Sequence, residues 1–101
     1  MSNLFEQTYK KYGPGITRLD NHDTVEVWPY MIRFIRTDKC IVHRLDGPAM
    51  IWEDGDFDWW INGFCITYQI RPWANEIGID LDNLTDDDKV LIKLAWGNFS
   101  I

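Results

Sequence analysis

Two turn dipeptides, Asp54-Gly55 and Asn62-Gly63, constrain the fold of this chain more than any other feature of its sequence. Each lies between alternating apolar residues. Both pairs are strong hairpin signals, because glycine and asparagine readily adopt the positive φ angles of tight turns. Two hairpins in tandem form a meander. Residues 40–68 are therefore predicted to fold as an antiparallel β-meander.

A two-residue loop at each turn sets the register of this meander. It places Trp52 opposite Phe57 in the first hairpin and Trp59 opposite Ile66 in the second. Directly opposed residues share a face, so one side is expected to form the core and the other a mixed surface. The predicted core side consists of Met50, Trp52, Phe57, Trp59, Ile61, Phe64, Ile66 and Tyr68. The other side consists of Ala49, Ile51, Glu53, Asp56, Asp58, Trp60, Cys65 and Thr67.

A short helix and further strands are predicted before the meander. Three aromatic residues recur at helical spacing within residues 1–15, and Gly13-Pro14-Gly15 would end that helix. The β-rich runs that follow extend the antiparallel sheet, which is predicted to span residues 16–68. One of its connections, Asp38-Lys39, lacks the glycine of a tight turn, so either a two-residue loop or a longer one fits there.

Helical periodicity replaces the strand pattern over residues 69–97, which are predicted to form a helical cap. Pro72 is suited to the first turn of a short helix that Gly78 can end. Thr85 and Asp88 resemble a capping box at the start of a second, stronger helix. The apolar stripe by which this helix is expected to pack on the sheet consists of Val90, Leu91, Leu94 and Ala95.

These elements predict one α+β domain that comprises residues 1–101. Its architecture is a twisted antiparallel β-meander with one or two C-terminal helices packed on one face and a short N-terminal helix. The C-terminal helices are expected to cover the side that carries Trp52 and Trp59. With 46% hydrophobic residues, the chain has enough apolar surface to offset the conformational entropy lost on folding.

Charge is distributed unevenly along the chain, whose net charge is −6. Residues 1–45 contain seven basic and five acidic residues (+2), and residues 46–101 contain three basic and eleven acidic residues (−8). An acidic field repels phosphate backbones, so direct binding of nucleic acid is disfavoured unless the basic half folds into one patch. A protein partner with a basic surface fits better.

Cys40 and Cys65 are the only cysteines, and both fall in strand-like segments. No secretory signal and no apolar run of membrane-spanning length accompanies them. These observations predict a cytoplasmic location and no membrane association. In that compartment two free, half-buried thiols are expected rather than a disulfide.

Residues 43–49, with the sequence His-Arg-Leu-Asp-Gly-Pro-Ala, are followed by Trp52, Asp54-Gly55, Trp59-Trp60 and Asn62-Gly63. This order resembles the tandem repeat of phage and bacterial proteins that reads HRxDGPA, then an aspartate-glycine turn, then WWxNG. Those repeats are similar to MORN-type β-hairpin repeats. Here one complete unit is present, and the chain then passes into helices.

The resemblance implies a bacteriophage or bacterial origin and a binding role rather than a catalytic one. For a phage-encoded protein, the expected location is the host cell cytoplasm. Repeat arrays need about three units to bury a continuous core, so the appended helices are expected to cap the single unit. The family brings no catalytic residue to this chain.

No constellation in the sequence predicts metal binding. Asp54, Asp56 and Asp58 have the alternate spacing of a calcium loop, but its sixth and twelfth positions hold Trp59 and Cys65 instead of glycine and glutamate. The two histidines of the chain lack the paired spacings of zinc motifs. We therefore expect no metal site and no cofactor.

A nucleophilic site built from Cys40, His43 and Asp46 is not expected either. Cys40 and His43 are three positions apart, so on a strand they would point to opposite faces. His43 is instead interpreted as stabilising a turn near Asp46, with Gly47 supplying an unusual backbone angle. The chain is therefore predicted not to be an enzyme.

Trp60 is the large aromatic residue on the mixed side of the predicted meander, where Glu53, Asp56 and Asp58 surround it. Tryptophan is enriched at binding hot spots, and a rim of carboxylates suits lysine or arginine on a partner. These four residues form the predicted protein-binding site. The alternative is that Trp60 packs under the N-terminal helix and the acids only aid solubility.

The function predicted from these features is that of a small acidic phage-type accessory protein. Such a protein would bind and modulate or inhibit a host protein, for example a defence nuclease or another nucleic-acid enzyme. Two alternatives stay open: a small-ligand or nucleotide-binding module that uses stacked aromatic residues, and a structural subunit of a phage assembly. The oligomeric state does not follow from the sequence.

Overall fold

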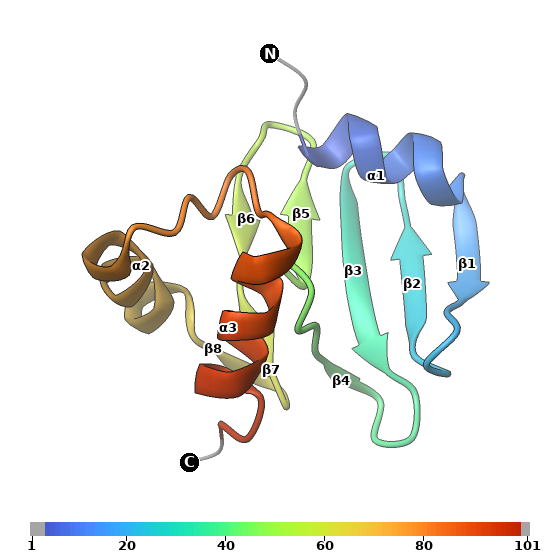
Figure 1. Cartoon of the computed structure of the whole chain (residues 1–101). Coiled ribbons are helices and arrows are strands. Elements are labelled where there is room, and N and C mark those ends of the chain that lie inside the picture. Colours follow the sequence, from blue (N-terminus) through green and yellow to red (C-terminus); the bar gives the residue numbers. More distant parts are fainter. Residues whose placement is uncertain (1–3, 100–101) are drawn as a thin grey trace.

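The computed structural model of the protein describes residues 4–99 (Figure 1). The N-terminal elements are α1 (Leu4–Tyr12), β1 (Gly15–Arg18), β2 (Thr24–Val27) and β3 (Met31–Arg36). The meander contains β4 (Ile41–Val42), β5 (Met50–Trp52), β6 (Phe57–Asp58), β7 (Trp60–Ile61) and β8 (Phe64–Cys65). The C-terminal elements are α2 (Thr67–Ile77) and α3 (Asp86–Trp96). The predicted α+β class, with an antiparallel meander and C-terminal helices, is confirmed.

The strands form a six-stranded sheet and a separate two-stranded hairpin. The larger sheet has the order β1-β2-β3-β5-β6, and β4 pairs with β3 beside β5. β7 pairs with β8 alone, and every pair in both sheets is antiparallel. The break at Trp59, between β6 and β7, turns the chain from the first sheet into the second.

Each sheet has its own hydrophobic core. α1 packs on the larger sheet through Phe5, and its partners there are Val25, Val27, Ile32, Phe34, Ala49 and Ile51. The second core joins the β7–β8 hairpin to α2 and α3, and consists of Trp59, Ile61, Ile66, Ile70, Ala74, Ile79 and Ile92. In Figure 1, α1 and α3 both lie in front of the strands.

The turn between β5 and β6 contains three residues rather than the two predicted. The Gly55 N–H donates to the Trp52 carbonyl (3.1 Å), and the Trp52 N–H donates to the Asp56 carbonyl (2.8 Å). Residues 53–55 therefore form the loop. Gly55 has a φ of 97°, which is the left-handed conformation that closes a three-residue hairpin.

This additional loop residue changes which side chains face the core. Ile51 lies opposite Phe57, so the prediction that Trp52 occupies that place is wrong. Ala49 and Ile51, which were expected on the mixed side, are fully buried. Trp52 and its neighbour Met50 lie on the opposite face, away from α1.

The second hairpin follows the sequence prediction. Ile61 lies opposite Phe64, and Asn62 and Gly63 have φ angles of 51° and 83°, as a two-residue type I′ turn requires. The inward residues Trp59, Ile61 and Ile66 are fully buried.

α2 begins earlier than predicted. The strand ends at Cys65, and Thr67 starts the helix, five residues before Pro72. Thr67 is buried, and its hydroxyl is satisfied there because it accepts the Trp59 N–H (2.9 Å) and donates to the Asp58 carboxylate (3.2 Å). Tyr68, which was expected in the core, is 84% exposed. The end of the helix is as predicted, since Gly78 closes it with a φ of 83°.

The capping box of α3 is confirmed, but its packing face is not the predicted one. The Asp88 N–H donates to the Thr85 hydroxyl and the Thr85 N–H donates to the Asp88 carboxylate, both at 3.1 Å. The buried residue of α3 is Ile92. The predicted stripe faces solvent, with exposed fractions of 55% for Val90, 47% for Leu91 and 79% for Leu94.

Candidate functional site

The face of the larger sheet opposite α1 carries a row of apolar and charged side chains. The strand register places Ile16, Glu26, Arg33, Met50 and Asp58 side by side across five strands. Arg33 and Glu26 form an ion pair. α1 packs on the other face of this sheet, whereas α2 reaches this face at Asp58, whose carboxylate accepts the Thr67 hydroxyl.

A shallow hollow of about 330 Å³ lies where this face meets the ends of two hairpins. The lining residues are Tyr30, Trp52, Glu53, Asp54 and Asp56. The two hairpin ends are joined, because the Glu53 N–H donates to the Tyr30 carbonyl (3.2 Å). Tyr30 is 58% exposed and the three acidic residues are exposed. We call this feature the aromatic-acidic hollow.

The aromatic-acidic hollow contains two of the four residues predicted to bind a protein. Glu53 and Asp56 lie in it, whereas Asp58 is half-buried one position further along the same face. The Asp58 carboxylate accepts hydrogen bonds from the Thr67 hydroxyl (3.2 Å) and the Trp52 indole (3.5 Å). Asp58 therefore holds the meander to α2 and supports the Trp52 ring.

Trp60 does not lie with these acids. It packs against the core under α1, and its indole nitrogen is fully buried with no hydrogen-bond partner among residues 4–99. The expected face shared by Trp60, Asp56 and Asp58 is therefore wrong, because the strand breaks at Trp59, between β6 and β7, and the alternation of side chains does not continue across that break. Trp52 and Tyr30 supply the aromatic surface instead. In the sequence, the position of Tyr30 directly after Pro29, in the turn between two strands, could have indicated that this tyrosine is exposed.

Residues 44–48 of the repeat-like motif form an excursion out of a strand. The Phe34 carbonyl accepts the His43 N–H (3.0 Å), and the Phe34 N–H donates to the Ala49 carbonyl (2.7 Å). The chain thus leaves the edge of β3 after His43 and returns to it at Ala49. This excursion accounts for the arrangement in which β4 and β5 pair with the same strand.

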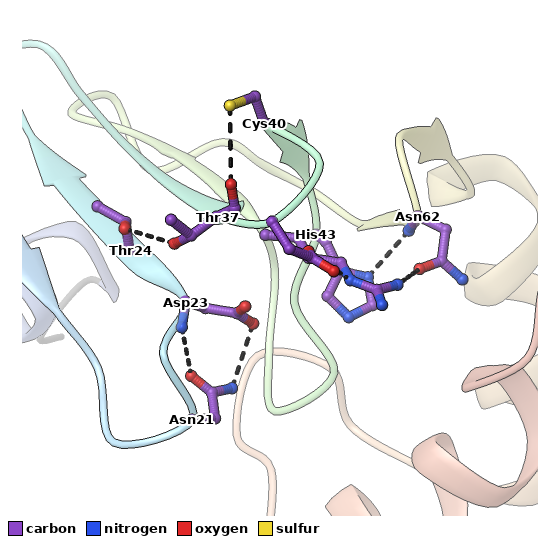
Figure 2. A network of polar contacts seen from close by, with 9 residues as sticks. Asn21, Asp23, Thr24, Thr37, Cys40, His43 and Asn62 are labelled. Carbon is purple, nitrogen blue, oxygen red and sulfur yellow. Dashed lines mark hydrogen bonds and ion pairs between the residues drawn. The ribbon is translucent and has the colours of Figure 1, made fainter.

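His43 stabilises a turn, but a different one from that predicted. Its Nδ1 atom accepts the N–H of Asn62 (2.9 Å), and Figure 2 shows the ring directed at Asn62. The motif is thereby fixed to the tip of the second hairpin. The expected partner region, near Asp46, is not the one used, because Asp46 pairs with Lys93 of α3 (2.8 Å).

Gly47 serves close packing rather than an unusual backbone angle. Its φ lies outside the positive range, and a Cβ atom there would lie 2.9 Å from Nη1 of Arg44. The Arg44 guanidinium lies 3.9 Å from the centre of the Phe34 ring, and its Nη1 donates to the Pro48 carbonyl (3.2 Å). Cation–π contact and close packing hold this mostly buried cation in place.

The pKa values of His43 and Asp46 are both below their usual range. Burial lowers the pKa of His43, against the opposing charge of Asp23. Partial burial alone would raise the pKa of Asp46, but the hydrogen bond and charge of Lys93, with Arg44 and Lys89, outweigh it. Both shifts have the same sign, so the unfolded chain binds these protons more readily than the folded chain.

Acidification is therefore expected to destabilise the fold, first through His43. The contribution of neutral His43 to the free energy of unfolding is fully present above the pKa of the unfolded chain, about 6.5. It is lost as the pH falls through the lower pKa of the folded chain. One proton changes the unfolding free energy by at most about 1.4 kcal/mol per pH unit. Urea unfolding of the wild type and His43→Gln between pH 7.5 and 5 measures this, and the variant should show the smaller slope. Equal slopes would contradict the assignment.

The two cysteines of the chain are not joined to each other. Cys40 and Cys65 are free thiols, and both are exposed rather than half-buried as predicted. Among residues 4–99, no three His, Cys, Asp or Glu side chains gather closely enough to hold a metal ion. In the same part of the chain, none of the helices has the length and apolar character needed to cross a membrane.

Comparisons of the chain with protein-family models, with curated proteins and with solved structures gave no match.

Proposed function

We propose that this chain is a small acidic accessory protein of phage type that binds a host or phage protein with a basic surface and modulates or inhibits it. The aromatic-acidic hollow is the proposed contact site. The partner would place lysine or arginine side chains among Glu53, Asp54 and Asp56 and pack their aliphatic parts on Tyr30 and Trp52. A defence nuclease or another nucleic-acid enzyme has a surface of this kind.

The observation that carries the proposal is the close association of two aromatic rings with three exposed carboxylates. Tyrosine and tryptophan bury a large area for little loss of side-chain entropy, which makes them frequent hot-spot residues. Carboxylates beside them add specificity for cations and accelerate association. Trp52 is also held by Asp58, so part of the ordering cost is met before binding.

The surroundings of the hollow favour the same class of partner. Met31 lies opposite Trp52, and Met50 lies opposite Arg33 on the next row of the open sheet face. Flexible methionine side chains adapt to irregular partner surfaces. The excess of acid in residues 46–101 would attract a basic protein over a distance of about a Debye length, roughly 8 Å at physiological salt.

Affinity capture from the native host, followed by calorimetry with the purified partner, tests the proposal. Tyr30→Ala is expected to weaken binding about 30-fold, the effect of losing a hot spot of about 2 kcal/mol. Asp56→Lys should weaken it at least about tenfold, and added salt should weaken wild-type binding. Matched controls are Tyr68→Ala and Glu76→Lys, which remove an exposed aromatic residue and reverse a charge on α2.

The proposal requires a difference between the two pairs of variants. A captured partner that binds Tyr30→Ala and Asp56→Lys as tightly as the wild type would overturn it. So would a partner whose binding depends on Tyr68 and Glu76 instead, because the contact would then lie on α2.

A further inference from the structure

A polar groove runs along residues 44–48 and is lined by residues of α1 and α3. Both helices lie in front of the strands in Figure 1, on the opposite side of the sheet from the aromatic-acidic hollow. Two adjoining hollows of about 240 and 190 Å³ make it up, and both are lined by Arg44, Asp46 and Lys89. The C-terminal end of α1 closes the larger hollow through Lys11 and Tyr12. The repeat-like motif therefore forms a wall of this groove.

Positive charge is concentrated in the larger hollow. Four of the ten lysine and arginine residues line it, and they come from three distant segments: Lys11, Arg44, Lys89 and Lys93. The carboxylates in the lining are those of Asp23 and Asp46, so the lining carries a charge of +2 in a protein of net charge −6. The fold thus gathers cations that the sequence distributes between its basic and acidic halves.

The cations of the hollow exceed the counter-charge available to them. Asp46 pairs directly with Lys93 (2.8 Å) and also feels the charges of Arg44 and Lys89. One carboxylate therefore faces three positive side chains. Asp23 is engaged with its own loop, where its carboxylate accepts the Asn21 side-chain amide (3.2 Å).

Arg44 is the cation best placed to bind a ligand. Its ring contact with Phe34 and the approach of Gly47 fix the guanidinium rigidly. Of its five N–H donors, one is used by the Pro48 carbonyl, and residues 4–99 supply no further hydrogen-bond acceptor. A fixed guanidinium with free donors is suited to a planar or tetrahedral anion.

We propose that this groove binds a small phosphate-bearing anion, held by Arg44 and Lys89 with Lys11 at the rim. The anion would supply counter-charge in the larger hollow, where four cations face the carboxylates of Asp23 and Asp46. Tyr12 and Leu19 in the same lining would contact an organic part of the ligand. A free phosphate and the phosphate of a small organic molecule share this chemistry. An extended nucleic acid does not fit, because Asp82 lines the second hollow and Asp86 to Asp88 begin α3.

Titration of the isotopically labelled full chain with inorganic pyrophosphate and with phenyl phosphate, followed by NMR, tests this site. Saturable shifts are expected at the backbone amides of Lys11, Asn21, Leu45 and Lys89, in excess of those caused by sodium chloride at equal ionic strength. Tighter binding of phenyl phosphate would identify an organic ligand, and tighter binding of pyrophosphate an inorganic one.

Variants make the test specific. Lys89→Gln and Lys11→Gln should each weaken binding of the probe about tenfold, the effect of one charge-assisted hydrogen bond of about 1.4 kcal/mol. Lys39→Gln, which removes an exposed cation on the β3–β4 loop, should have no effect. Shifts that do not saturate, or that survive both groove variants, would overturn the inference. The groove and the aromatic-acidic hollow share no residue, so either proposal can fail without the other.

Discussion

Ile92→Ala is expected to lower the free energy of unfolding by about 2–5 kcal/mol, whereas Leu94→Ala should change it by less than about 0.5 kcal/mol. Ile92 is fully buried in the second core with Trp59 and Ile66. Its truncation removes transfer free energy and leaves a cavity. Leu94 is two positions further along the same helix and is 79% exposed, so its truncation leaves no cavity.

Urea unfolding at a constant m-value measures both effects on one scale. The two variants are well matched, because both positions lie within α3 and in each case an aliphatic side chain of the same size is shortened to alanine. The reverse order, with Leu94→Ala the more destabilised variant, would mean that α3 packs through the stripe predicted from the sequence.

Two competing apolar stripes explain why the packing of α3 does not follow from its sequence. Val90, Leu91 and Leu94 form the larger stripe, but Ile92 and Trp96 form the second, at i and i+4. The second stripe is the one that packs on the protein, because Trp96 contacts Trp73 of α2 edge to face, with ring centres 5.8 Å apart. That partner comes from another element, so local periodicity does not identify it.

Turn chemistry predicts where the hairpins lie but not the number of loop residues in each. Asn62-Gly63 forms the expected two-residue turn, whereas Asp54-Gly55 belongs to a three-residue loop. Glycine satisfies the positive φ in both cases, so the dipeptide alone does not distinguish them. A difference of one residue exchanges the two faces of a strand, and this places Trp52 outside rather than inside.

In the candidate sites too, residues of a local turn are predictable from the sequence, whereas residues brought together by tertiary packing are not. Glu53 and Asp56 belong to a turn that the sequence identifies, and both were predicted as binding residues. Tyr30 joins them through a neighbouring hairpin, which requires knowledge of the strand order. The cations of the groove lie up to 82 positions apart, from Lys11 to Lys93, and only the packing of α1 and α3 on one side of the sheet brings them together.

Asn62→Ala is expected to lower the free energy of unfolding by about 2–4 kcal/mol, more than a turn residue usually contributes. The Asn62 side chain accepts a hydrogen bond from Nη1 of Arg36 and donates one to the Phe99 carbonyl, both at 3.0 Å. It therefore links the second hairpin to β3 and to the end of the chain. Alanine loses both bonds and also strains the backbone, whose φ is 51°.

Asn62→Gly separates these two causes. Glycine adopts a positive φ without strain, so this variant should be more stable than Asn62→Ala by about 1 kcal/mol but still less stable than the wild type. Its remaining deficit measures the bonds to Arg36 and Phe99, of which the one to the charged Arg36 should contribute more. Urea unfolding of the three proteins at pH 7 gives both differences. A glycine variant as stable as the wild type would show that Asn62 acts only as a turn residue, and that the hairpin tip is held to β3 and the chain end without its side chain.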